Sequence, residues 1–111
     1  MSRRLAHKFE TNDPNRFIEV SVSYNKPPEY IDDRLPKTPY YLVAVTVVKR
    51  EGAFEVRTAY SGYKTTLAAP ERYNAGKLIV ALNDAVRADY ALNLVHRVAA
   101  ENDLEVFGAD K

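Results

Sequence analysis

The sequence has 111 residues, of which 46% are hydrophobic and 28% are charged, an ordinary composition for a globular protein. A chain of this length buries one modest hydrophobic core, so we expect a single domain over residues 1–111, with a flexible N-terminal segment at residues 1–14. Without cysteine, the chain has no disulfide framework, no thiolate nucleophile and no cysteine-based metal site. The formal charge of +1 excludes an overall polybasic or polyacidic character.

Membrane and export signals are the next features to consider. The most apolar run, Leu42 to Val48, is far shorter than the ~20 residues that a membrane-spanning helix needs. The basic residues of segment 1–8 are not followed by the apolar region of a signal peptide. We therefore expect an unprocessed, soluble protein of the cytoplasm that makes no contact with a membrane.

Three segments show the two-residue period of β-strands. Residues 16–24 alternate apolar and polar side chains, which predicts a half-buried strand. Residues 40–49 are apolar on both faces, which indicates a central strand with neighbours on both sides. A short turn follows at residues 50–53, where Gly52 can adopt a positive φ, and residues 54–60 alternate again. The last two segments therefore predict a hairpin.

From Pro70 onward the hydrophobic period becomes that of a helix. The apolar stripe of residues 75–86 and that of residues 92–99 are offset by roughly a third of a turn, so we expect a break near residues 87–90, with Asp89 as the cap of a second helix. Residues 104–107 are a candidate short terminal strand. The predicted fold is α+β: a three-stranded antiparallel sheet, or a four-stranded one if residues 104–107 join it, with a broken C-terminal helical segment packed on one face.

The connection Asn25 to Pro39 holds four of the six prolines in fifteen residues. Loops of this length are uncommon in compact domains unless they have a function, although a passive spacer remains an equal alternative. Prolines lower the entropy that the loop would lose on binding, and tyrosine is favoured at interfaces. We expect the partner-binding surface here, with Tyr30 as the anchor. The neighbouring contacts would come from Ile31, Asp32, Asp33 and Arg34.

A second candidate surface lies between residues 57 and 77, where cations are interleaved with tyrosines. Cations can hold phosphates and aromatic rings can stack on bases, so this composition suits nucleic-acid binding, although it is also close to average composition. The residues of this alternative site are Arg57, Tyr63, Lys64, Arg72 and Lys77.

Catalytic and metal-binding patterns are weak. His96 can share a helical face with Asp89 and Asn93, but a solvated polar face explains this spacing better than a general base does. The acidic residues of the loop do not have EF-hand spacing, and the stretch 61–66 lacks the upstream glycine of a phosphate-binding loop. We therefore expect no enzymatic activity, no metal and no cofactor.

Residues 37–65 carry a resemblance to a known group of proteins. Tyr40-Tyr41-Leu42-Val43-Ala44, followed by Val47 and Gly52, resembles small uncharacterised proteins of phages and plasmids, in which Pro-Arg-Gly precedes Tyr-Tyr-Leu. Lys37-Thr38-Pro39 stands in place of Pro-Arg-Gly here. The group includes anti-CRISPR proteins, so the resemblance implies a mobile-element accessory protein. We expect a non-catalytic protein that binds a macromolecule and inhibits a bacterial defence or host enzyme. A protein partner is the leading expectation, and a nucleic-acid-binding module is the alternative.

Overall fold

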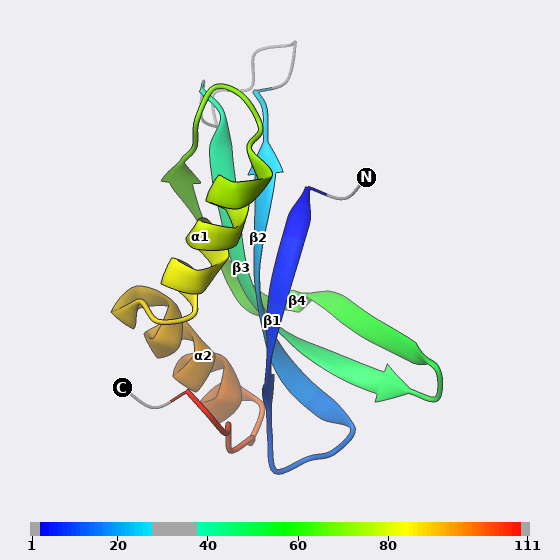
Figure 1. Cartoon of the computed structure of the whole chain (residues 1–111). Helices are drawn as coiled ribbons and strands as arrows, with labels where there is room; N and C mark the ends of the chain where they lie inside the picture. Colours follow the sequence, from blue (N-terminus) through cyan, green and yellow to red (C-terminus); the bar gives the residue numbers. More distant parts are fainter. Residues whose placement is uncertain (1–2, 28–37, 110–111) are drawn as a thin grey trace.

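The chain is described by a computed structural model that covers residues 3–27 and 38–109. Four strands are followed by two helices (Figure 1). The elements are β1 (Arg4–Glu10), β2 (Arg16–Asn25), β3 (Tyr40–Glu51), β4 (Phe54–Ala68), α1 (Ala75–Ala85) and α2 (Asp89–Glu101). The strands form one antiparallel sheet in the order β1-β2-β3-β4, so each strand pairs with its neighbour in the sequence.

The α+β class is confirmed, and the central position of β3 is confirmed as well. The fourth strand is β1, which lies within the N-terminal segment 1–14 that we expected to be flexible. The segment 104–107, the candidate terminal strand, pairs with the chain at the end of β1 only through an isolated antiparallel bridge between Thr11 and Val106 and is not a full strand of the sheet. The sequence does not reveal β1 because Phe9 is its one buried residue, so the strand lacks the alternation of apolar and polar side chains that marks a half-buried strand.

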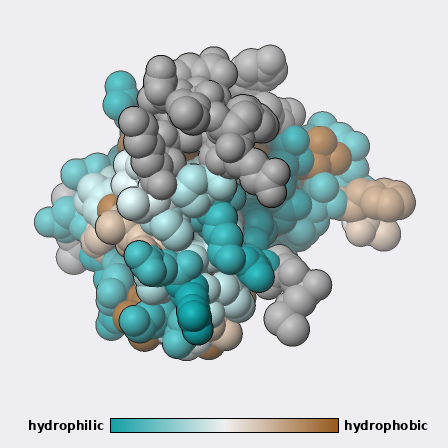
Figure 2. Space-filling view, turned by 90° about the horizontal axis from the view of Figure 1, so that it is seen from above, coloured by the Kyte–Doolittle hydropathy of each residue, from teal (hydrophilic) through white to brown (hydrophobic). Residues whose placement is uncertain are grey.

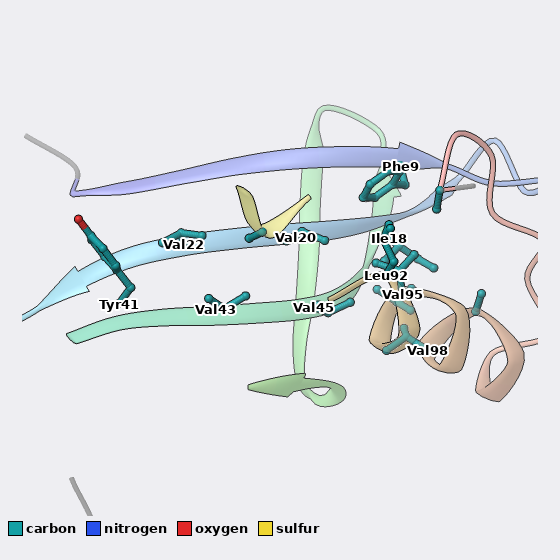
Figure 3. Close-up of a cluster of buried hydrophobic side chains, with 14 of the residues drawn as sticks. Phe9, Ile18, Val20, Val22, Tyr41, Val43, Val45, Leu92, Val95 and Val98 are labelled. Carbon is teal, nitrogen blue, oxygen red and sulfur yellow. The ribbon is translucent and has the colours of Figure 1, made fainter. Parts of the chain in front are cut away.

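One face of the sheet forms the main hydrophobic core with the two helices. Directly opposite residues of neighbouring strands share a face, and here the shared residues are apolar throughout. Leu92, Val95 and Val98 of α2 lie beside Ile18 and Val45 of the sheet (Figure 3). The cross-strand pairs of this face are Ile18 with Val47, Val20 with Val45, Val22 with Val43, and Tyr24 with Tyr41.

The helical region is broken as predicted, because α1 ends at Ala85 and α2 begins at Asp89. The predicted cap is one residue off: Ala88 takes the N-cap position without a side-chain hydrogen bond, and Asp89 lies in the first turn, where a negative charge is favourable. The polar face of α2 is solvated, since Asp89, Asn93 and His96 are exposed. Among the described residues, no helix is long and apolar enough to cross a membrane.

The β3–β4 hairpin bends sharply in its middle. Thr46 pairs with Gly62, whereas Val48 pairs with Arg57, so the register shifts between these two positions. A Cβ on Gly62 would lie 2.0 Å from the carbonyl oxygen of Val45, and only glycine permits this close approach of the two backbones. Beyond the shift, the outer part of the hairpin leaves the direction of the main sheet (Figure 1).

Candidate functional site

The outer part of this hairpin, residues 48–57, forms a projecting element that we call the arm. Its turn contains Gly52, whose φ of +61° confirms the predicted turn. Phe54 at the tip is 76% exposed, and Val56 beside it is 37% exposed. In the view from above, the arm extends from the body of the molecule and carries apolar surface at its end (Figure 2). The arm therefore presents an aromatic side chain to the surroundings.

Ion pairs connect the arm to β1 and β2. Arg57 binds Glu19 through two parallel hydrogen bonds, Nε to Oε2 at 3.0 Å and Nη2 to Oε1 at 2.8 Å. This bidentate geometry is the strongest arrangement of a guanidinium and a carboxylate. Lys8 of β1 reaches Glu55 of the arm at 2.9 Å. Both strands beside the arm therefore contribute to holding it in place.

A small apolar contact lies beneath the arm on the face of the sheet opposite the helices. Phe17 and Val48 are fully buried there, although neither belongs to the main core. Lys8 Nζ lies 4.9 Å and Arg50 Cζ lies 4.6 Å from the centroid of the Phe17 ring, and the aliphatic stems of such side chains cover apolar surface. Arg50 also pairs with Glu10 at 2.6 Å. Packing and charge thus act together at the base of the arm.

The same face of the sheet, which we call the open face, is hollowed next to the arm. A groove of about 320 Å³ lies over β2, β3 and the inner half of β4. The cross-strand register places the small side chains of Ser21 and Ala44 next to Lys64 in its middle. The described residues that line it are Arg4, Glu19, Ser21, Ser23, Leu42, Ala44, Val45, Thr46, Arg57, Gly62, Tyr63 and Lys64.

Glu19 organises the charges around this groove. Its residue is 1% exposed, and its Oε2 accepts a further hydrogen bond from Arg4 Nη2 at 2.7 Å. Burial alone would raise the pKa of Glu19, but the hydrogen bond from Arg57 and the charges of Arg4 and Arg57 together hold that pKa below its usual value. Glu19 is therefore ionised at neutral pH and fixes both guanidinium groups at the groove.

The predicted nucleic-acid residues are only partly brought together. Arg57 and Lys64 both line the groove on the open face. Tyr63 pairs with the core residue Val45 and so points to the helix-covered face, where its hydroxyl donates a hydrogen bond to Glu101. That hydrogen bond is the main reason why the pKa of Tyr63 is raised. The remaining two residues lie elsewhere, Arg72 before α1 and Lys77 in its first turn.

The residues of the proline-rich loop that we expected to bind a partner lie outside the described residues. They are Tyr30, Ile31, Asp32, Asp33 and Arg34.

The stretch 61–66 lies within strand β4 and not in a loop before a helix, which agrees with its rejection as a phosphate-binding loop. His96 Nε2 forms a hydrogen bond with the carbonyl oxygen of Ala109 at 2.9 Å. Across residues 3–27 and 38–109, no group of acidic or imidazole side chains is arranged to hold a metal ion.

The sequence did not point to Arg4, Lys8 or Glu19 as site residues. Glu19 occupies a polar position of an alternating strand, which by itself predicts a solvated side chain. The missing signal was β1, in which Arg4 and Lys8 alternate with residues that face the helices. Recognition of β1 as the neighbour of β2 would have placed Lys8 directly opposite Glu19 and Arg4 opposite Ser23.

Comparison with protein-family models, curated proteins and solved structures finds no match for this chain. The functional argument therefore depends on the geometry of the arm and the groove.

Proposed function

We propose that this chain is a non-catalytic protein that binds a protein partner through its β3–β4 arm. The observation that carries the proposal is the exposed Phe54, 76% accessible, at the tip of an element braced by ion pairs. Burial of such a side chain against a partner contributes about 2–3 kcal/mol, and aromatic residues are frequent anchors in protein interfaces.

The bracing supports this proposal because binding costs less when the binding element is already ordered. Arg57, Arg50 and Glu55 hold the arm to three side chains of β1 and β2. A freely moving hairpin would lose conformational entropy when its tip enters a partner pocket. The braced arm avoids much of that loss, so the energy gained at Phe54 is available for affinity.

A nucleic-acid partner is less well supported by the same geometry. Arg57 already binds two carboxylates, those of Glu19 and Glu55, and its charge is therefore compensated. Tyr63 faces the helices, where it cannot stack on a base at the groove. Of the predicted cations, only Lys64 both lines the groove and has no ion pair with a described residue.

The biological role that we propose is inhibition of a bacterial defence or host enzyme, as an accessory protein of a phage or plasmid. The support for this role is the resemblance over residues 37–65, a range that contains the whole arm. An inhibitor of this kind needs a surface that docks on its target and no catalytic centre of its own. The arm meets the first of these requirements.

Affinity capture with matched variants tests the proposal. The immobilised chain is exposed to a bacterial lysate, and retained proteins are identified by mass and quantified. Phe54→Ala should reduce retention of the partner by about tenfold or more, since that corresponds to the loss of ~1.4 kcal/mol at an anchor. Phe107→Ala removes another exposed phenylalanine, 51% accessible, and should retain the partner fully. Equal retention by both variants would show that the arm is not the interface.

A further inference from the structure

We propose that the groove beside the arm is a carboxylate-binding site that takes an acidic segment of a partner protein, with Lys64 and Arg4 as its cations. The inference rests on the proposed function in one respect, that the partner is a protein. Its site is separate from the tip of the arm, and its residues are different from Phe54.

The charge of the groove lining is the first step. Among the lining residues that the structure describes, Arg4, Arg57 and Lys64 are the cations and Glu19 is the one acidic residue. Arg57 is compensated by Glu19 and Glu55, so the cations that remain for a ligand are Arg4 and Lys64. Glu19 is committed to the two guanidinium groups. Lys64 has no ion pair with any residue that the structure describes, so its ammonium group is available to a ligand. An anion is therefore the complementary occupant.

The second step is that side chains around the groove have hydrogen-bond donors available to a ligand. Arg4 contacts Glu19 through Nη2, and its side chain is 40% exposed. Within the described part of the chain, its Nε and Nη1 atoms donate to no other group. Ser23 Oγ accepts a hydrogen bond from the amide of Asn25 at 3.1 Å and keeps its own proton to donate. These donors surround the same hollow.

The spacing of the two cations is the third step. Arg4 lies on β1 and Lys64 on β4, in neighbouring cross-strand rows. Three strand spacings and an offset of two residues along the strands separate their backbones by about 16 Å, and both side chains are long enough to reach inward over Ser21 and Ala44. Because these two residues are small, a carboxylate can rest above them within reach of both cations. The volume of about 320 Å³ suits one or two ligand side chains.

The lining also favours an acidic peptide over a nucleic acid. Binding of single-stranded nucleic acids combines cations with aromatic rings on which bases stack. Among the lining residues whose side chains the structure describes, Tyr63 is the one aromatic residue, and its ring faces the helices under Arg97, whose Cζ lies 5.0 Å from the ring centroid. The described lining residues thus offer charge and hydrogen bonds but no stacking surface. A carboxylate needs only the first two.

The inference is tested by titrating the full chain with a capped hexaglutamate peptide at low salt while NMR chemical shifts are recorded. Shifts should concentrate at Ser21, Ser23, Ala44 and Lys64. Lys64→Gln should weaken binding by about tenfold, because it removes a charge-assisted contact. Lys77→Gln removes an exposed lysine of α1 outside the groove and should leave the affinity unchanged. Equal weakening by both variants would mean general charge attraction and would overturn the site.

A second variant keeps the test decisive if Lys64→Gln alters the fold. Ala44→Glu places a carboxylate of the chain itself at the centre of the groove, on the open face away from the core, and should abolish peptide binding. Retained binding of the peptide would contradict the proposal.

Oligothymidylate and inorganic phosphate test whether the groove binds phosphate groups instead. If either binds more tightly than hexaglutamate, with the same sensitivity to Lys64→Gln, the groove is a phosphate site and the carboxylate site is overturned. Phe54→Ala should bind hexaglutamate as the wild type does, so failure at the groove and failure at the arm are distinguishable.

Discussion

Replacement of Glu19 by glutamine tests whether the ion pairs on the open face brace the arm. The substitution preserves the size of the side chain and removes its charge. In the wild type, the carboxylate accepts three hydrogen bonds, at 2.7, 2.8 and 3.0 Å, from Arg4 and Arg57. A glutamine amide turns a donor toward guanidinium groups that are themselves donors, so at least one of these hydrogen bonds is lost.

The expected loss of stability is about 2 kcal/mol. A hydrogen bond to a charged group contributes about 1.5–3 kcal/mol to stability. The lower part of this range applies because the side chains of Arg4 and Arg57 are 40% and 37% exposed, so water can solvate both guanidinium groups once the carboxylate charge is gone. For a domain of this size, the melting temperature should fall by roughly 8 °C.

Thermal and urea unfolding of the wild type and two variants measure this effect. Glu51→Gln is the matched control, because Glu51 pairs with Lys49 at 3.3 Å while both side chains are more than half exposed. It should change the free energy of unfolding by less than about 0.5 kcal/mol. Amide hydrogen exchange in the arm should accelerate in Glu19→Gln and not in the control. A Glu19→Gln protein as stable as the control, with unchanged exchange in the arm, would refute the bracing role.

The pH dependence of the same variant follows from the lowered pKa of Glu19. Since this carboxyl ionises more readily in the folded state than in the unfolded chain, its contribution to stability is complete above the ordinary glutamate pKa of 4.5 and is lost as the pH falls through the folded-state pKa. The stability difference between the wild type and Glu19→Gln should therefore be largest near neutral pH and shrink in acid. A difference that grows below pH 4.5 would contradict the assignment.

Three further substitutions test the fold. Gly62→Ala should destabilise the protein markedly, because the new Cβ would lie 2.0 Å from the Val45 carbonyl oxygen; wild-type melting would show that the strands can separate there without cost. Leu78→Ala should reduce the free energy of unfolding by about 2–5 kcal/mol, as measured in urea, since Leu78 is 2% exposed. Tyr24→Phe should cost about 1 kcal/mol in the same assay, because its hydroxyl lies 2.8 Å from the Pro70 carbonyl oxygen, and no loss would mean that this contact is dispensable.

The elements that the sequence predicts well are those whose pattern has one dominant cause. Burial of one face produces the alternation in β2, and burial at the centre of the sheet produces the continuous apolar run in β3. The offset between two helical stripes predicts the break between α1 and α2, because a straight helix would have buried His96. Gly52 is identifiable since a tight turn requires its positive φ.

The elements that the sequence does not reveal depend on contacts between distant segments. β1 has little apolar periodicity of its own and is defined by its hydrogen bonds to β2. Glu19 has the local pattern of a solvated residue, yet it is buried because Arg4 and Arg57 arrive from positions 15 and 38 residues away. No local signal reports such partners, so the sequence did not predict the groove, and among its charged lining residues only Arg57 and Lys64 belonged to a predicted site.

The register shift in β4 connects the arm to the groove. If Val48 paired in the same register as Thr46, the hairpin would continue in the plane of the sheet and Arg57 would not reach Glu19. The shift turns the outer strands toward the open face, and one guanidinium group thereby both braces the arm and lines the groove. Gly62, which permits the close backbone approach at this point, is therefore a structural requirement of both surfaces. A partner that contacts the tip of the arm with one segment has the groove directly beside it for a second, acidic segment, and two linked contacts bind more tightly than either does alone.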